Sequence, residues 1–295
     1  MNSLPQPLTV GLTTFLSQEL KSTVTIQNFT AIGGGCINNG GKITTSHGIF
    51  FVKWNSAKKF PGMFRVESNG LKLLSSAGAI RVPRVLGPGE HEGHQFIVME
   101  LIQAKNRSLN YWDLLGQELA TLHKASSPYF GLDENNYMGS LPQFNEQKIS
   151  WIEFFSTQRL DVQLKLAINS HAAPISLIEK FHALYEKLPT LLTEEKPSLV
   201  HGDLWSGNLI TDENGNPCLI DPAVYYGNRE VDLAMTHLFG GFDDEFYQSY
   251  QNAFPLPPGL QERIDIYNLY PLLVHVNLFG QSYLHQVLSI LKTFD

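Results

Sequence analysis

The sequence predicts an α+β chain of two lobes, in which a small β-rich N-terminal lobe precedes a larger, mainly helical C-terminal lobe. Three observations lead to this prediction. A length of 295 residues with 43% hydrophobic and 17% charged residues suits two domains or one two-lobed body. Short strand-like runs dominate residues 1–103, and helical periodicity dominates residues 104–295. We therefore expect the lobes to meet near residue 103.

Composition excludes several classes of partner. The formal net charge is −7 and no Lys/Arg cluster stands out, so neither nucleic acid nor an anionic membrane is expected to bind. The N-terminus lacks the pattern of a signal peptide, and no run of about 18 apolar residues occurs. Cys36 and Cys218 fit neither a disulfide framework nor a zinc spacing. We expect a cytoplasmic protein with a neutral or cationic substrate, and the oligomeric state stays open.

The N-terminal lobe is expected to begin with a helix and a strand. Residues 12–21 carry apolar side chains at helix-like intervals, and residues 23–26 alternate as a strand does. A glycine-rich turn over residues 33–41 leads into a second strand. Glycine lets backbone amides approach a ligand closely, so such a turn can cover phosphates, although a hairpin turn without a ligand fits the pattern equally well. The residues assigned to phosphate contact are Gly33, Gly34, Gly35 and Cys36.

Two charged residues interrupt apolar patterns in the same lobe. Lys53 lies on an apolar face of a strand expected over residues 48–54. Glu67 lies on the apolar stripe of a helix expected over residues 61–77. A buried charge needs an opposite partner, so we expect these two side chains to pair. The alternatives are an edge lysine that reaches solvent, and a glutamate that pairs with a nearby surface lysine or arginine.

The remaining elements follow from periodicity and from turn residues. Strands over residues 82–89 and 95–102 complete an expected five-stranded sheet, which with one helix makes up the lobe. The pattern then becomes helical, so a hinge is expected over residues 100–106. One short hairpin is expected near residues 207–221. Helices are predicted over residues 110–125, 150–170, 175–188, 231–239, 243–252, 260–279 and 281–292.

Three residues of the C-terminal lobe suggest one reaction. Asp203 precedes Asn208 by five residues, and Asp221 follows thirteen residues later at the end of a short apolar run. Kinases place a base and two metal ligands with this spacing. We assign Asp203 as the base that accepts the proton of the substrate hydroxyl, and Asn208 and Asp221 as ligands of Mg²⁺, which prefers oxygen. Pro222 predicts an extended backbone at Asp221. The predicted reaction is phosphoryl transfer from ATP.

A kinase-like arrangement gives residues of the N-terminal lobe a role in binding ATP. Lys53 lies about where such a lobe carries the lysine that contacts the α- and β-phosphates, and Glu67 would hold that lysine. The backbone of Glu100 and Ile102 would hydrogen-bond adenine, with Met99 behind it. A buried strand that contacts no ligand fits the same residues. The residues assigned to the nucleotide around the hinge are Met99, Glu100, Leu101 and Ile102.

Longer motifs resemble the fructosamine kinase (ketosamine-3-kinase) family. The resemblance lies in Val200 to Asn208, Ile220-Asp221-Pro222-Ala223, Tyr225 to Ala234, Gly35-Cys36-Ile37-Asn38, Phe51-Val52-Lys53 and the Glu67 segment. The family is related to the aminoglycoside and choline phosphotransferases and has the protein-kinase-like fold. The resemblance implies ATP-dependent phosphorylation of the 3-hydroxyl of a ketosamine, a sugar adduct on an amine, after which the amine is released. It implies deglycation repair of fructosamine, ribulosamine or erythrulosamine adducts, small or protein-bound.

Two departures separate the chain from protein kinases. Gly202 stands where those enzymes carry arginine, and Pro222-Ala223 replaces Phe-Gly, so no phosphorylation-controlled activation loop is expected. Aromatic rings near the base could stack on a sugar, and an acid could pair with an amine. The candidates for substrate contact are Trp205, Tyr225, Glu230 and Asp232. For Asp232 the alternative is a structural role, in which it satisfies amides of the catalytic loop.

Three rival functions remain compatible with these residues. A kinase of another small alcohol, such as an aminoglycoside, choline or homoserine, would use the same constellation. A nucleotide-binding pseudokinase with a scaffolding role would bind ATP without turnover. A metal-dependent hydrolase would use His201, Asp203 and Asp221 around a transition metal.

Overall fold

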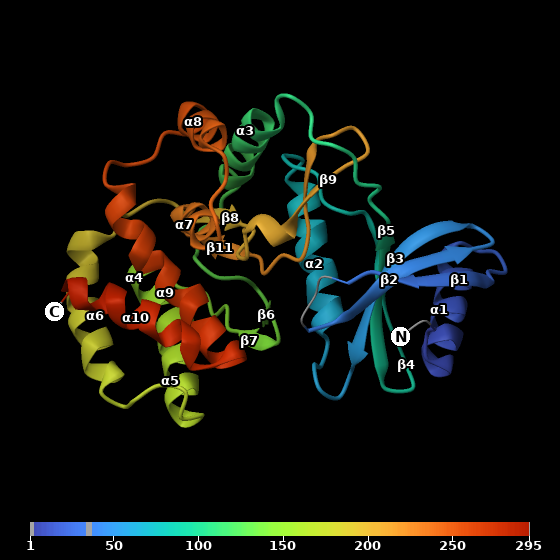
Figure 1. Ribbon diagram of the computed structural model, residues 1–295, viewed down its shortest axis with the longest axis horizontal. Helices are drawn as coiled ribbons and strands as arrows, with labels where there is room; N and C mark the ends of the chain where they lie inside the picture. The colour runs from blue at the N-terminus through green and yellow to red at the C-terminus, as the bar shows by residue number, and fades with distance from the viewer. Residues whose placement is uncertain (1–2, 34–36, 295) are drawn as a thin grey trace.

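The structure, a computed structural model, describes residues 3–33 and 37–294 of the chain. Two lobes lie side by side in Figure 1, a sheet-containing lobe formed by the first hundred residues and a larger helical lobe formed by the rest. This is the predicted two-lobed α+β fold. The segment from residue 101 to residue 110 joins the lobes without a helix or strand. The predicted border at residues 103 and 104 falls in this segment and stays a prediction.

The N-terminal lobe is built on an antiparallel five-stranded sheet with the strand order β1-β2-β3-β5-β4. Its strands are β1 (Ile26–Ala31), β2 (Asn39–Thr45), β3 (Gly48–Ser56), β4 (Val85–His91) and β5 (His94–Glu100). The strand expected from residue 23 before the glycine-rich turn is β1, but it begins only at Ile26. Val24 packs into the core instead, and its amide donates to Ser17 Oγ (3.0 Å).

Two helices flank this sheet, and they cover the helix-like spacing noted over residues 12–21 and the helix expected over residues 61–77. In α1 (Gln6–Glu19), Leu8, Leu12 and Leu16 are fully buried and pack in one cluster with Val52 and Phe96 of the sheet. In α2 (Met63–Ser76), the apolar side chains pack in the cluster that also contains residues of the C-terminal lobe. Figure 1 shows α2 between the sheet and the larger lobe. A charged residue on α2 can therefore take part in contacts between the lobes.

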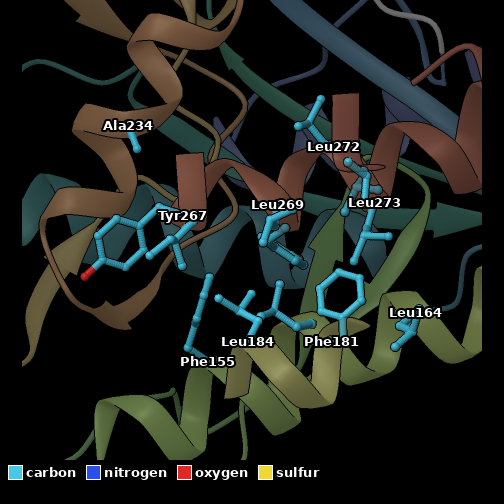
Figure 2. Close-up of a cluster of buried hydrophobic side chains, with 14 of the residues drawn as sticks. Phe155, Leu164, Phe181, Leu184, Ala234, Tyr267, Leu269, Leu272 and Leu273 are labelled. Atoms are coloured by element: carbon cyan, nitrogen blue, oxygen red, sulfur yellow. The ribbon is translucent and has the colours of Figure 1, made fainter. Parts of the chain in front are cut away.

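The C-terminal lobe is a helical body around one large apolar core. Figure 2 shows part of this core, in which Phe155, Phe181 and Leu273 come from helical segments far apart in the sequence. All seven predicted helical regions are present, and the second of them is interrupted by a π-helical turn over Phe155–Leu160. The helices are α3 (Tyr111–His123), α4 (Trp151–Phe154), α5 (Asp161–Asn169), α6 (Leu177–Leu191), α7 (Glu230–Leu238), α8 (Asp244–Ala253), α9 (Leu260–Phe279) and α10 (Leu284–Leu291).

Three pairs of short strands complete this lobe. The expected hairpin near residues 207–221 is the pair β9 (Leu209–Thr211) and β10 (Pro217–Leu219). The other pairs are β6 (Asn136–Met138) with β7 (Leu141–Gln143), and β8 (Ser198–Val200) with β11 (Tyr225–Gly227). Because β8 pairs with β11, the segments that follow Val200 and precede Tyr225 are brought together. Among the described residues, no helix is long and apolar enough to cross a membrane.

Candidate active site

Lys53 connects the two lobes at the centre of the candidate site. It lies on β3, is only 8% exposed, and its Nζ is 2.7 Å from Glu67 Oε1 and 2.6 Å from Asp221 Oδ1. Burial disfavours the ammonium charge, but the two carboxylates more than compensate and raise the pKa of Lys53. The lysine is therefore a fixed cation held from both lobes.

Glu67 reaches Lys53 from α2, as its position on the buried stripe of that helix predicts. The rival idea of a surface partner for Glu67 is not supported, since Arg65 pairs with Glu134 of the other lobe instead. The contact with Lys53 fixes the orientation of the ammonium group toward Asp221.

Asp203 and Asn208 lie together in the loop between β8 and β9. The Asn208 Nδ2 group donates to the backbone oxygen of Asp203 (2.8 Å) and to its Oδ2 atom (2.9 Å). Burial raises the pKa of the Asp203 carboxyl to about 7, while the hydrogen bond from Asn208 acts in the opposite direction. The Asn208 amide donates only to Asp203, and no hydrogen bond to its Oδ1 atom occurs among the described residues, so this oxygen is available as an acceptor.

Asp221 has an unusual backbone. Its φ is +55°, in the left-handed region that L-residues with a Cβ rarely occupy, so the extended conformation expected from Pro222 was wrong. Tertiary hydrogen bonds decide this geometry: Ile220 N donates to Asn208 O (3.0 Å) and Ala223 N donates to His201 O (2.9 Å). The Asp221 side chain remains 42% exposed, so it can contact Lys53 and a ligand together.

Gly202 explains how these two segments come so close. A Cβ on Gly202 would lie 2.1 Å from the carbonyl oxygen of Ala223, and its φ is +82°. An arginine at this position, as in protein kinases, would therefore require a different path for the chain after Asp221.

Buried groups behind the loop hold it in place. Asp232 accepts from the amides of His201 (2.7 Å) and Gly202 (2.9 Å), and also from His123 Nε2 (3.1 Å). The His201 ring accepts from the amide of Asp203 at Nδ1 and donates to Ile220 O from Nε2 (3.0 Å). Burial lowers the pKa of His201, so the ring stays neutral. These contacts agree with the structural alternative for Asp232, in which it satisfies amides of the catalytic loop. A substrate contact is not supported, because Asp232 is only 1% exposed.

Two further substrate candidates are turned away from the site. Glu230 is fully buried and forms a bidentate ion pair with Arg263 (2.7 and 2.5 Å), so it is not offered to a substrate amine. Tyr225 is 2% exposed and packs against Phe154 and under the Arg159 guanidinium, 4.0 Å from its ring centre. A stacking role on a sugar is therefore not supported for Tyr225.

Trp205 is the substrate candidate that the structure leaves accessible. It lies two residues after Asp203, is 36% exposed, and packs edge-on against Phe239 at 5.8 Å between ring centres. Phe239 in turn lies 4.9 Å from the ring of His275, which contacts Tyr283. These partly exposed rings form an aromatic wall that begins next to Asp203, and its members beyond Trp205 were not predicted.

The predicted nucleotide residues occupy the end of β5 and the segment after it. Met99 is buried between β3 and β4, and Glu100 accepts from the amide of Arg84 (2.8 Å). Leu101 and Ile102 follow the strand with partly exposed side chains. Gly33 is exposed, and apart from its chain neighbours no atom of the described residues lies within 4 Å of the position that a Cβ would take. The predicted contacts of Gly34, Gly35 and Cys36 lie outside the described residues.

A second set of contacts between the lobes was missed. Arg81 precedes β4, and its Nη1 lies 2.7 Å from Asp212 Oδ2 and 2.8 Å from Glu213 Oε1 in the β9–β10 turn. The backbone carbonyl of Arg81 also accepts from Leu219 N (2.9 Å). No local pattern links Arg81 to a turn that lies more than 130 residues further along the chain.

The arrangement combines a fixed cation, a carboxylate oxygen and an amide oxygen with free bonding capacity, and a buried carboxyl group beside them. A cation, oxygen ligands for a metal and a carboxylate of this kind suit phosphoryl transfer, because its catalysis consists mostly of positioning and charge neutralisation. The contacts of His201 with its own loop leave it no free nitrogen for a metal, which argues against the hydrolase alternative.

Known proteins resemble this chain over almost its whole length. The model of the fructosamine kinase family matches residues 10–294. A probable ketoamine kinase of Synechocystis sp. is 41% identical over 282 residues, which cover 94% of this chain and 93% of the relative. The chloroplastic protein-ribulosamine 3-kinase of Arabidopsis thaliana is 39% identical over 269 residues, with 90% of this chain and 81% of the relative covered.

Solved structures show the same fold. A crystal structure of a candidate fructosamine-3-kinase from Haemophilus somnus 129PT has a TM-score of 0.88 and 29% identity, and 97% of each chain is covered. A thermostable mutant of the aminoglycoside phosphotransferase APH(4)-Ia has a TM-score of 0.60 at 16% identity, with 95% of this chain and 98% of that chain covered. The protein-kinase-like fold predicted from the sequence is confirmed.

Proposed function

The chain belongs to the fructosamine kinase family, and from this premise we propose that it transfers the γ-phosphoryl group of ATP to the 3-hydroxyl of a ketosamine. Phosphorylation makes the sugar adduct labile and releases the amine, so the reaction serves deglycation. A fructosamine, ribulosamine or erythrulosamine on a small or protein-bound amine is the acceptor class. We propose a cytoplasmic site of action, although the Arabidopsis relative is named as chloroplastic.

One observation carries the proposal. The Lys53 ammonium group lies within 2.7 Å of Glu67 and Asp221, so a cation from the N-terminal lobe meets a carboxylate from the C-terminal lobe beside the base Asp203. In the proposed complex Lys53 contacts the α- and β-phosphates, and Glu67 holds the lysine in place. A buried charge that is held this firmly needs no rearrangement when the phosphates bind.

The residues near Lys53 suit Mg²⁺. Asn208 has a free Oδ1 atom because its amide hydrogens are donated to Asp203, and Asp221 has a partly exposed carboxylate. Hard oxygen donors of this kind fit a magnesium ion, which usually takes its other ligands from water and phosphate. When bound, the ion neutralises charge on the phosphates. Asn208 and Asp221 would hold it.

Asp203 orients the acceptor hydroxyl and takes its proton. Its carboxylate is steadied by Asn208 and lies two residues from the exposed indole of Trp205. We propose that the sugar of the ketosamine lies along the aromatic wall of Trp205, Phe239 and His275. A net charge of −7 favours an acceptor that carries a protonated amine.

The adenine is proposed to lie at the end of β5. The backbone of Glu100 and Ile102 would hydrogen-bond it, with Met99 and Leu101 at the border of the pocket. The glycine turn that includes Gly33 would cover the phosphates.

The proposal is tested by measuring acceptor-dependent ADP release with Mg-ATP. The panel contains a fructosamine, a ribulosamine and an erythrulosamine of the same lysine derivative, together with hygromycin B, choline and homoserine. We expect turnover with at least one ketosamine and none above background with the other alcohols. Turnover confined to an aminoglycoside, choline or homoserine would assign the chain to another acceptor. Nucleotide binding without turnover on any acceptor would support the pseudokinase alternative.

A further inference from the structure

The segment from Glu134 to Gln143, here called the strap, crosses from the C-terminal lobe to two elements of the N-terminal lobe. It contains β6 and β7, and Figure 1 shows this hairpin beside the end of α2. The site described above does not include it. Its contacts nevertheless reach the helix that carries Glu67 and the segment that carries Asp221.

Glu134 binds two side chains of α2, one with each carboxylate oxygen. Arg65 Nη1 lies 2.6 Å from Oε2, and Asn69 Nδ2 lies 2.6 Å from Oε1. Partial burial acts against the charge, but the bonds from Asn69 and Arg65 lower the pKa of Glu134, so the carboxylate is ionised at neutral pH. Arg65 and Asn69 lie two residues before and two residues after Glu67 on the same helix. Contacts that hold these two side chains therefore also restrict the translation of α2 along its axis and its rotation, and with them the position of Glu67.

The same segment contacts the chain just before α2 and within the glycine-rich region of residues 33–41. The Tyr137 hydroxyl donates to Pro61 O (3.0 Å), two residues before α2 begins. At the tip of the hairpin, a Cβ on Gly139 would lie 3.0 Å from side-chain atoms of both Ile37 and Leu278, so the tip packs closely between the lobes. The strap therefore contacts both the residues that lead into α2 and the glycine-rich turn.

Buried amides anchor the strap beside Asp221. Asn136 Nδ2 donates to Val224 O (2.8 Å), and Gln143 Nε2 donates to Ala223 O (3.0 Å). Gln143 Oε1 accepts from Tyr270 Oη (2.7 Å), which ties this anchor to α9. Asn136 is 7% exposed and Gln143 is 1% exposed, so these bonds are shielded from water. One rigid segment thus holds the neighbours of Asp221 and, through Glu134, the helix of Glu67.

Apolar packing alone does not fix α2 on this side. A cavity of about 350 Å³ lies between α2 and the C-terminal lobe, and its walls include Val66, Asn69 and Leu73 of the helix and Leu132 and Val224 opposite. Phe64, Leu71 and Leu74 of α2 pack in the apolar cluster shared with the C-terminal lobe, and the polar contacts at the rim of this cavity add to that packing.

We propose that Glu134 is a positioning residue, which acts through α2 to keep Glu67 against Lys53 and so prepares the phosphate-binding cation without an activation loop. The inference rests on the proposed function for the role of Lys53. Exposed ion pairs contribute little to global stability, and Arg65 is 59% exposed in its side chain. The expected effect of losing Glu134 is therefore on nucleotide binding rather than on unfolding.

The test is a double-mutant cycle that measures the dissociation constant of Mg-AMP-PNP by calorimetry. Glu134→Ala is expected to weaken binding about fivefold to tenfold, and Glu134→Gln, which keeps an acceptor for Asn69, to weaken it less. In a Glu67→Gln background, Glu134→Ala should weaken nucleotide binding by less than a further factor of two. The reason is that Glu134 acts by positioning Glu67, and the charged contact of Glu67 with Lys53 is already lost. Glu146→Ala removes a carboxylate that pairs with Lys148 in its own lobe, and should stay within twofold of the parent.

Four outcomes are decisive. Parent-like binding by Glu134→Ala would overturn the proposal, and so would losses that multiply in the double variant, since these would show that Glu134 acts independently of Glu67. Because no acceptor is present, a parent that binds the nucleotide but does not phosphorylate ketosamines would refute the proposed acceptor and leave this inference standing. Failure of the parent to bind Mg-AMP-PNP would overturn both.

Discussion

Two clusters of charged and polar side chains differ in the hydrogen-bonding capacity that they leave for a ligand. The open cluster consists of Lys53, Glu67, Asp203, Asn208 and Asp221. The closed cluster consists of Glu195, Arg229, Glu230 and Arg263. Both contain close ion pairs between residues distant in sequence, so pairing alone does not distinguish a reactive site from a structural one.

Free bonding capacity distinguishes them. In the closed cluster Glu230 gives both oxygens to Arg263, and the Arg229 guanidinium is shared between Glu195 and two backbone carbonyls. In the open cluster Asp221 is 42% exposed in its side chain, and Asn208 keeps an unused acceptor oxygen. A ligand site is therefore distinguished by charged and polar groups that protein contacts hold in place but that keep free hydrogen-bonding or metal-binding capacity.

The largest expected effect comes from changing Asp203, the proposed base, in the open cluster. Asp203→Asn keeps the size and the contact with Asn208 but cannot accept a proton, so kcat should fall about 10³-fold. The dissociation constant of Mg-AMP-PNP should stay within twofold of that of the parent. Steady-state kinetics and calorimetry measure the two quantities. A variant with near-normal kcat would remove Asp203 from the role of base.

The matching change in the closed cluster should affect stability and not chemistry. Glu230→Gln leaves the buried Arg263 guanidinium without a full counter-charge and should lower the free energy of unfolding by about 3 kcal/mol. Turnover per folded molecule should stay within threefold of the parent. Urea denaturation measures the loss, with Glu153→Gln, which breaks an exposed pair with Lys148, as the control. If Glu230→Gln instead lost turnover at full stability, the distinction between the clusters would fail.

The effect of replacing Asp221 should depend on Mg²⁺, because the open cluster is proposed to bind this ion through Asp221. Asp221→Ala is expected to lower kcat/KM for ATP about 10²-fold, because a proposed ligand of the charge-neutralising ion is lost. Calorimetry should show weaker nucleotide binding than the parent with Mg²⁺ and a much smaller difference in EDTA. An equal loss in both conditions would mean that Asp221 acts through Lys53 and not through a metal.

Trp205 should give the smallest effect, confined to the acceptor. Trp205→Ala removes an exposed aromatic face and should raise KM for the ketosamine about fivefold to tenfold, with KM for ATP unchanged. Tyr129→Ala, which removes another exposed ring of the same lobe, serves as the control. A rise in KM for ATP alone would place Trp205 on the nucleotide side of the site.

Local patterns predicted the parts of the fold and site that depend on periodicity. The helices of the C-terminal lobe and the sheet of the other lobe follow from apolar spacing. Lys53 and Glu67 could be paired from their positions in the sequence, because each interrupts an apolar face and a buried charge needs a partner.

Tertiary contacts explain what the sequence could not predict. Glu230 is buried because it pairs with Arg263, which lies 33 residues further along the chain. The local sequence around Glu230 contains no sign of this partner, so a substrate contact was an equally good interpretation. Pro222 favours an extended residue before it, but hydrogen bonds to Asn208 and His201 impose the left-handed φ of Asp221. The strands of the strap have three residues each, which is too short for a periodic pattern to predict them.

The most direct test of ketosamine phosphorylation with Asp203 as the base is the position of the phosphate in the product. The parent enzyme is incubated with Mg-ATP and a ketosamine of lysine labelled with ¹³C in the sugar, and the product is examined by ³¹P- and ¹³C-detected NMR. We expect coupling of phosphorus to carbon 3 of the sugar, and no such signal with Asp203→Asn. Phosphate on another hydroxyl or on the amine, or an undiminished signal with Asp203→Asn, would contradict this mechanism.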